Sequence, residues 1–386
     1  MIIYKTKVLD ILKMMILQVL QENLAKALST SSRFTSTKAQ LPVLANIALS
    51  AKKNRLLISA TNLELSISVS IGAKVTKEGE LTIPARVITD LVVNLNSGSL
   101  NLSSEKEHLK ISSNNFTSTI SGMNSSDFPS IPYEVGKGAT SFPKDTIIDS
   151  LSSVLFAASS DETRPVLTGV LLIFEPGKLT FVATDGFRLS KKQINIKSQS
   201  IPTGIKNLIL PKNSLSELSR LSGEAEEIKL SLKEGESQVV FGVGDSVLSS
   251  RIIDGEFPDF EKIIPKETVS KITLDKEELL RAVKLASVFA RDAANVVKIA
   301  VGKDTVNVSA ESSQSGSQDM QVDAKVEGET KNIKIAFNFR FLEDFLNAVK
   351  ADDVQIELGG PNSPGVFTDP KDANFLHLIM PVRIQD

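Results

Sequence analysis

One pattern occurs three times in this sequence, as PARVITDLVVNL from Pro84, PKNSLSELSRLS from Pro211 and NFRFLEDFLNAV from Asn338. Each copy begins with a residue type that starts helices. Counted from that residue, Ile88, Leu215 and Leu342 occupy equivalent positions, and successive copies are 127 residues apart. A spacing that is kept twice indicates an internal repeat of the fold.

A second set of helices is expected about 60 residues before these, in LQENLAKAL from Leu20, PKDTIIDSL from Pro143 and DKEELLRAV from Asp275. Apolar residues at i, i+4 spacing, such as Leu24 and Leu28, form one face of each helix. Strand-like runs such as RLLISATNLELSISV surround them. The sequence therefore predicts three copies of one α+β domain, each with two helices packed on antiparallel sheets.

Proline-rich linkers separate the copies. DFPSIP (residues 127–132) and EFPDFEKIIP (residues 256–265) are expected to stay extended, because proline is unfavourable inside a helix. We expect domains at residues 15–138, 139–266 and 267–386, with residues 1–14 as an extension outside the repeat. Repeated domains with exposed strand edges tend to extend edge to edge, and closure into a ring removes the free edges.

Composition excludes several classes of protein. Of 386 residues, 44 are Lys or Arg and 46 are Asp or Glu, so the net charge of −2 argues against a domain that coats nucleic acid by bulk charge. The chain has no cysteine, which excludes disulfides and thiolate metal sites. Asp10 and Lys13 interrupt the apolar N-terminal run, and no stretch is long enough to span a membrane. We expect a cytoplasmic protein.

Motifs for catalysis were not found. The two histidines, His108 and His377, lie in separate repeats without metal-ligand spacing, and no phosphate-binding loop or nucleophile elbow occurs. Asp185 and Arg188 of ATDGFRLS fit an acid and anchor pair, or more simply an Asp-Gly turn beside a strand. We expect no enzymatic activity, cofactor or metal. A hydrolase and a β-rich adhesion array remain as alternatives.

Five motifs carry a resemblance to a known family: LPVLANIALS, TRPVLTGVLL, VATDGFRLS, RIIDGEFPDFEKIIP and HLIMPVRI. Together, in this order, they resemble the bacterial DNA sliding clamps, the beta subunit of DNA polymerase III. The resemblance implies a head-to-tail homodimer of three-domain chains, closed into a six-domain ring with helices around the hole. Such a ring encloses double-stranded DNA without reading its sequence and tethers the polymerase, which gives processivity.

DNA contacts in such a ring are expected from basic residues on the helices and two loops. Scattered Lys and Arg attract phosphates without fixing a position along DNA. The alternative for each helix residue is an ordinary solvated face. The candidates are Lys26, Arg86, Lys212, Arg281 and Lys284 on helices, with Lys38 and Arg164 in loops.

A pocket for partner peptides is implied between the second and third domains. The implied partners are the DNA polymerase III alpha subunit, the clamp loader, and repair polymerases and ligase that carry a clamp-binding motif. Burial in the core is the alternative reading for Leu167, Ile263 and Leu378. The pocket residues implied by the resemblance are Leu167, Thr184, Gly186, Phe187, Arg188, Leu189, Pro258, Lys262, Ile263, Leu378, Ile379, Met380, Pro381, Val382 and Arg383.

The dimer interface is implied between the first domain of one chain and the third domain of the other. Phe116 and Ser118 are expected on one side, with Val288 and Phe289 on the other. Buried aromatic residues often dominate interface energetics. An exposed Phe in a monomer is the alternative.

Overall fold

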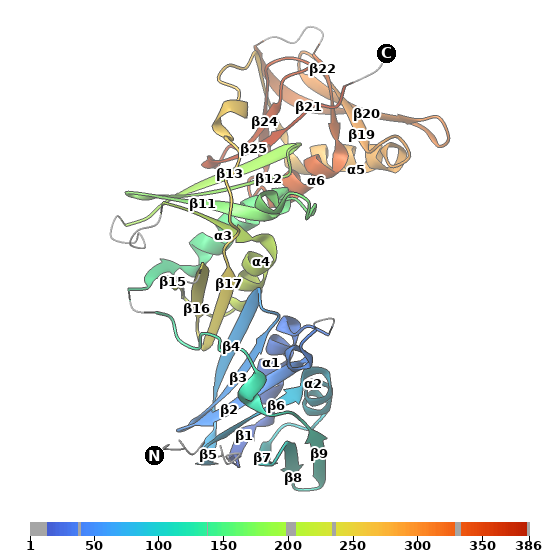
Figure 1. The fold of residues 1–386 in the computed structure, drawn as a ribbon. Coiled ribbons are helices and arrows are strands. Elements are labelled where there is room, and N and C mark those ends of the chain that lie inside the picture. The colour runs from blue at the N-terminus through green and yellow to red at the C-terminus, as the bar shows by residue number, and fades with distance from the viewer. Residues whose placement is uncertain are drawn as a thin grey trace. The chain divides into compact units, whose positions relative to one another are not determined.

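The computed structural model describes residues 14–37, 40–136, 138–197, 206–233, 237–328 and 333–383. All strand pairings among them are antiparallel (Figure 1). The expected N-terminal extension, apart from Met14, lies outside the described residues.

The first copy of the repeat contains two helices and nine strands. They are β1 (Ile16–Leu20), α1 (Gln21–Ser31), β2 (Asn46–Lys52), β3 (Arg55–Thr61), β4 (Leu65–Gly72), β5 (Lys74–Lys77), β6 (Gly79–Pro84), α2 (Ala85–Val93), β7 (Ser99–Glu105), β8 (His108–Ser113) and β9 (Phe116–Ser121).

In the described residues the second and third copies repeat this order with one strand fewer, because neither has a separate strand in the place of β5. The second comprises β10 (Thr140–Pro143), α3 (Lys144–Val154), β11 (Gly169–Glu175), β12 (Lys178–Thr184), β13 (Arg188–Asn195), β14 (Asn207–Pro211), α4 (Lys212–Leu221), β15 (Glu227–Lys233), β16 (Gln238–Val243) and β17 (Ser246–Arg251). The third comprises β18 (Ser270–Asp275), α5 (Lys276–Ala290), β19 (Val296–Val301), β20 (Thr305–Ser312), β21 (Gly316–Gly328), β22 (Lys334–Asn338), α6 (Phe339–Ala348), β23 (Asp353–Leu358), β24 (Gly365–Asp369) and β25 (Asp372–Ile379).

All six predicted helices are confirmed, and each follows directly on a strand. The predicted first residues, such as Pro84 and Pro143, are the last residues of those strands and precede the helix instead of starting it. Where the residue is polar, its side chain caps the helix: Asp275 accepts from the Glu278 N–H at 2.8 Å, and Asn338 from the Arg340 N–H at 3.0 Å.

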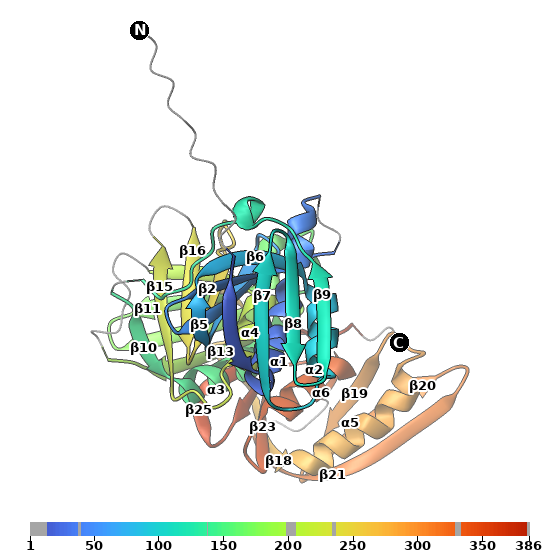
Figure 2. The same ribbon diagram turned by 90° about the horizontal axis from the view of Figure 1, so that it is seen from below.

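The helices bury the faces that the sequence predicted. Leu24 and Leu28 of α1 are completely buried, and so are Ile88 of α2 and Leu342 of α6. Helix α5 lies along the strands of the third copy, as Figure 2 shows. Leu279 of α5 belongs to the large apolar cluster beneath that helix.

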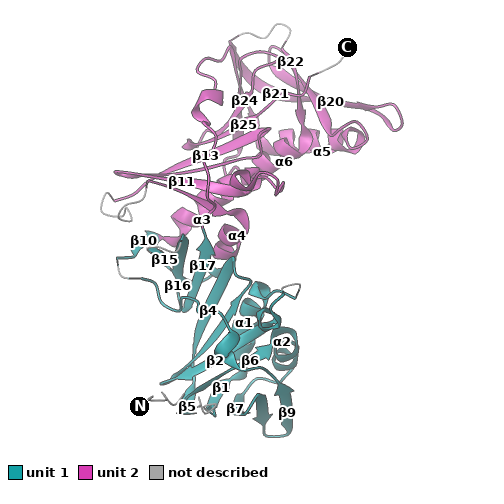
Figure 3. Cartoon of the chain, viewed as in Figure 1, with its two compact units in different colours: residues 1–142, 220–251 teal, residues 143–219, 252–386 magenta. Residues whose placement is uncertain are grey.

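The sheets join across the copies. Strand β17 of the second copy pairs with β4 of the first, which makes one sheet of order β10-β15-β16-β17-β4-β3-β2-β6. Strand β13 of the second copy pairs with β25 of the third within a twelve-stranded sheet. Two compact units result: unit 1 comprises residues 1–142 and 220–251, and unit 2 comprises residues 143–219 and 252–386 (Figure 3).

Core packing of α2 generates a prediction. Val92 is completely buried, whereas Val87 on the same helix is 50% exposed. We expect Val92→Ala to lower the free energy of unfolding by about 2 kcal/mol, because two methyl groups leave a packed site. Val87→Ala is the matched control and should change it by less than about 0.5 kcal/mol. Urea titration followed by circular dichroism measures both, and equal losses would contradict the packing described.

Candidate functional site

The residues expected to bind partner peptides all lie in unit 2, and all but Leu167 lie on three segments. Thr184, Gly186 and Phe187 form the turn from β12 to β13, and Arg188 and Leu189 begin β13. A second segment is the end of β25 and the chain after it, residues 378–383. The third, residues 258–263, ends in a short 3-10 turn, Glu261–Ile263. Leu167 lies apart from these in another 3-10 turn, Pro165–Thr168.

Backbone pairing holds the first two segments together. Arg188 pairs with Ile379 and Leu189 with Leu378 in the β13–β25 ladder. Beyond the ladder, the Met380 N–H donates to the Phe187 carbonyl at 2.8 Å. The turn and the C-terminal segment therefore have a fixed register at this point.

Burial divides the expected residues into two groups. Leu167, Leu189, Leu378 and Ile379 are buried, with Leu189 and Leu378 in one apolar cluster that also contains Phe260. Thr184 is buried as well, and its hydroxyl donates to the Arg188 carbonyl at 2.6 Å. For Leu167 and Leu378 the structure thus gives the core position that the sequence left open.

The second group is apolar and exposed. Phe187 is 63% exposed, Ile263 44%, Met380 40% and Val382 36%. Pro258 and Arg383 are exposed too, and Pro381 is half-buried. An exposed group of large apolar side chains is typical of an interaction surface. We call Phe187, Ile263, Met380 and Val382 the apolar surface.

Lys262 points into solvent beside this surface. Its side chain is 82% exposed and forms an ion pair with Asp259 at 2.8 Å. The hydrogen bond that Lys262 donates to the Asp259 carboxylate raises the pKa of Lys262, so its charge is present at neutral pH.

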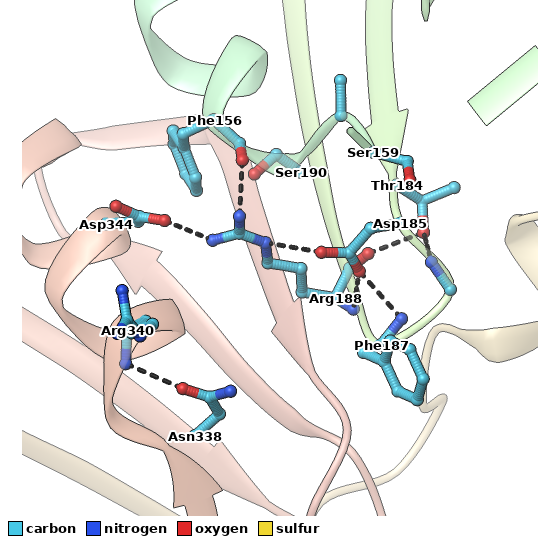
Figure 4. A network of polar contacts seen from close by, with 12 residues as sticks. Phe156, Ser159, Thr184, Asp185, Phe187, Arg188, Ser190, Asn338, Arg340 and Asp344 are labelled. Atoms are coloured by element: carbon cyan, nitrogen blue, oxygen red, sulfur yellow. Dashed lines mark hydrogen bonds and ion pairs between the residues drawn. The ribbon is translucent and has the colours of Figure 1, made fainter. Parts of the chain in front are cut away.

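Arg188 links the second copy to the third, as Figure 4 shows. Its guanidinium donates to Asp185 at 3.0 Å, to Asp344 of α6 at 2.5 Å and to the Phe156 carbonyl at 2.6 Å. The Phe341 ring lies under it, 4.4 Å from ring centroid to guanidinium carbon. With 10% of its side chain exposed, Arg188 is committed to this network.

Asp185 forms the Asp-Gly turn that the simpler interpretation predicts, and it also pairs with Arg188. One carboxylate oxygen accepts from the Phe187 and Arg188 N–H groups at 2.9 and 3.0 Å, which forms the turn. The other accepts from the Arg188 guanidinium. The same Asp185 carboxylate therefore holds both the turn and the ion pair.

His377 lies buried under the network. Its Nδ1 is 2.7 Å from the Ser190 hydroxyl, and its ring stacks on Phe345 with centroids 5.6 Å apart. Burial, followed by the charge of Arg188, lowers the pKa of His377 to about 3. Its Nε2 has no hydrogen-bond partner among the described residues. The ring is therefore neutral and structural, not a ligand.

Sequence analysis did not identify Phe156, Phe341 and Asp344. Each is far from Arg188 in the sequence, so no local motif joins them. One feature of the sequence could have identified Phe341 and Asp344 as contact residues. They lie next to Leu342 and Phe345, the buried positions of the helix, and are not themselves part of that buried face.

The expected DNA-contacting residues fall into two groups. Lys26, Arg86, Arg281 and Lys284 are exposed on helices, with 94% of the Arg86 side chain accessible beside Asp90. Arg164 and Lys212 instead line a common cavity in unit 2. Lys38 lies outside the described residues.

The expected dimer residues lie on two edges. Phe116 and Ser118 belong to β9, are half-buried, and face no second strand beyond β8 in the described chain. In the last turns of α5, Val288 is 58% exposed and Phe289 half-buried.

Two other kinds of feature are absent from the described ranges. No group of three or more His, Cys, Asp or Glu side chains there could hold a metal ion. Nor does any helix in those ranges have the length and hydropathy needed to cross a membrane.

A threefold α+β repeat with edge-joined sheets and an apolar surface at a junction defines the DNA clamp class of protein. Family models of the DNA polymerase III beta subunit match in order: the N-terminal domain at residues 15–132, the central domain at 141–259 and the C-terminal domain at 261–383.

Known proteins agree over nearly the whole chain. The beta sliding clamp of Synechocystis sp. is 31% identical over 385 residues, covering 94% of this chain and 98% of the relative. The structure of the Thermotoga maritima DNA polymerase III beta subunit is 26% identical with a TM-score of 0.87, covering 96% of this chain and all of that one. The C. crescentus beta sliding clamp structure is 28% identical with a TM-score of 0.89, covering 97% and 100%.

The chain belongs to the DNA polymerase III beta subunit family, the beta sliding clamps. Its function is that of a DNA sliding clamp for processive replication, and it is not an enzyme.

The buried His377 generates a prediction about pH. The unfolded chain binds a proton at this histidine near pH 6.5, whereas the folded chain does so only near pH 3. Folding stability should therefore fall as the pH drops from 6.5 towards 3, by about 1.4 kcal/mol per pH unit from this group.

His377→Asn should remove that part of the slope, and His108→Asn, at an exposed position, should keep it. Urea unfolding at pH 7, 6 and 5 measures the slopes. The same slope in both variants would show that His377 is not buried in its neutral form.

Proposed function

We propose that two copies of the chain close head to tail into a ring around duplex DNA. One observation carries this proposal: the same edge pairing occurs twice within the chain, as β17 with β4 and β13 with β25. Strand β9 is the counterpart of β17 and β25, and the first part of β21 is the counterpart of β4 and β13. In the described chain, β9 and the first part of β21 each have one edge without a partner strand. Pairing β9 with β21 of a second copy would repeat the edge pairing seen twice within the chain. It would also give the backbone N–H and C=O groups of both free edges hydrogen-bond partners.

Aromatic residues support the same interface. Phe156 follows α3 and lies at the β13–β25 junction, with its ring centroid 5.2 Å from that of His377. Phe289 likewise lies at the end of a helix, α5, beside Gly316 at the start of β21. We infer that Phe289, with Val288, meets the Phe116 and Ser118 edge of the partner.

DNA would pass the helices of this ring. Lys26, Arg86, Arg281 and Lys284 are exposed and suited to contacts with phosphates that do not depend on sequence. We keep 15–138, 139–266 and 267–386 as the boundaries of the clamp domains. The cytoplasm, where a bacterial chromosome is replicated, is the proposed location.

The apolar surface would receive partner peptides. Phe187, Ile263, Met380 and Val382 expose apolar area above the buried Leu189 and Leu378, an arrangement that suits short peptides with aliphatic or aromatic anchors. We propose the DNA polymerase III alpha subunit, the clamp loader, and repair polymerases and ligase as partners.

Retention on DNA tests the ring. After loading by the clamp loader, the protein should remain on circular duplex DNA and dissociate from the same DNA once it is linearised. Phe289→Arg should abolish retention on the circle by adding a charge to the interface. Gel filtration of the loaded complexes measures retention. Equal retention on circular and linear DNA would refute enclosure.

A double variant tests the apolar surface. Met380→Ala combined with Pro381→Ala should abolish binding of a partner peptide, since truncation of central anchors commonly costs several kcal/mol. Dimerisation, measured by light scattering, should be unchanged. Fluorescence anisotropy with a labelled peptide follows binding, and micromolar affinity in the double variant would show that the peptide binds elsewhere.

A further inference from the structure

A cavity of about 620 Å³ lies in unit 2, at the edge of the twelve-stranded sheet that β14 forms. Residues of β11 and β14 line one side of it, and the chain that follows β17, residues 252–261, lines the other. Its volume is in the range of cavities that bind small molecules or the side chains of a partner.

This cavity is separate from the expected peptide site. Of the residues expected there, Pro258 alone also lines the cavity, whereas the β12–β13 turn and residues 378–383 do not. No residue of the apolar surface lines it. The two sites can therefore be tested independently.

The floor of the cavity is apolar. Leu171 and Ile209 are 6% and 5% exposed and belong to the apolar cluster that contains Phe260. Ile173 and Phe257 are half-buried and pack against the same cluster. A ligand that covers this floor removes aliphatic and aromatic carbon from water, which is favourable.

The rim of the cavity is acidic. None of its described lining residues is a Lys or Arg, whereas four exposed carboxylates line it. They are Asp254, Glu256, Asp259 and Glu261. Because acidic and basic residues are nearly equal in number over the whole chain, the rim is a local concentration of negative charge.

Three of these carboxylates are available to a ligand. Lys262 donates to the Asp259 carboxylate at 2.8 Å, and this bond lowers the pKa of Asp259. Within the described part of the chain, Asp254, Glu256 and Glu261 form no ion pair. The rim therefore has acceptors without a cation of their own.

Gly255 fixes the acidic segment in its place. Its φ is +135°, and a Cβ at this position would lie 2.7 Å from Cγ1 of Val166. Glycine is the residue that allows the chain to adopt this conformation and to pass so close to Val166. Asp254 and Glu256, on either side of Gly255, are thereby held at the rim.

We propose that this cavity binds a basic segment of a partner protein, with Lys or Arg side chains at the acidic rim and an apolar neighbour on the floor. Lys and Arg suit the site because their aliphatic stems cover apolar surface while the charged ends stay in water. Complementary charge at an exposed rim also favours encounter with the correct partner.

Other ligands fit this cavity less well. The phosphates of DNA would be repelled by the carboxylates of the rim. A metal ion needs several ligands around one point, and in the described ranges no group of three or more His, Cys, Asp or Glu side chains could hold one. A peptide can distribute its positive charges along the rim.

Paired synthetic peptides test the site with the full-length protein. One peptide of nine residues has two leucines and two arginines, and its matched partner has glutamine in place of both arginines. In low salt the arginine peptide should bind about tenfold more tightly, as two partly exposed ion pairs predict. In high salt the preference should shrink, because the charges are screened. Isothermal titration calorimetry gives the affinities.

Asp254→Asn combined with Glu256→Gln should remove most of that preference and leave binding of the glutamine peptide unchanged. Both side chains are exposed, so the variant should fold. Glu261→Gln alone should reduce the preference in part, which provides a second measurement. Glu311→Gln is the matched control, because it deletes an exposed carboxylate of β20 outside the cavity and should keep the preference.

Three results would overturn the proposal. If neither peptide binds, or both bind equally, the cavity does not select a basic segment. If the preference survives in the Asp254 and Glu256 double variant, the cations bind elsewhere. Both results leave the apolar surface and its proposed partners standing. If the preference is lost in Met380→Ala with Pro381→Ala, the peptide occupies the apolar surface instead.

Discussion

Unpaired strand edges are the constraint on which this structure depends. A β-sheet presents a row of backbone N–H and C=O groups at each edge, and these groups need partners or water. Here the second copy of the repeat gives β17 to the sheet of the first copy and β13 to the sheet of the third. The chain is therefore held together by backbone hydrogen bonds across its repeats, and the compact units do not follow the repeat boundaries.

The same joining of sheets creates the functional surface. Since β13 and β25 pair side by side, the turn before β13 and the chain after β25 meet at one end of the ladder. Arg188 connects that end to α6 through an ion pair with Asp344. Because the Arg188 side chain is largely buried, loss of any one partner would leave its charge incompletely paired and lower the stability of the fold. The apolar residues Phe187 and Met380 are displayed on a rigid base, which lowers the entropic cost of binding a flexible peptide.

Much of the fold could be predicted from the sequence, because helix periodicity and helix-starting residues are local signals. The six helices begin within a residue of their predicted starts, and Leu24 and Leu28 are buried as expected.

Interactions between distant segments had no such signal. Which strand edges pair depends on geometry that single strands do not encode, and the approach of Asp344 to Arg188 joins residues 156 positions apart. The sequence also did not indicate which apolar side chains are exposed to solvent. Leu378 and Met380 lie two residues apart in one apolar motif, a spacing that would put both on the same face of a strand. The strand ends at Ile379, however, so Leu378 lies in the core and Met380, just past the strand end, is 40% exposed.

The absence of a loop between strand and helix limits how such chains can diverge in length. Because α2 starts at the residue after β6, one inserted residue at that boundary would rotate the helix by roughly 100° about its axis. The buried residues Ile88 and Val92 would then turn away from the sheet, because no loop lies between β6 and α2 to accommodate the inserted residue. Gains and losses of residues are therefore tolerated at hairpin tips, such as the one between β20 and β21, and rejected at the six strand-to-helix boundaries.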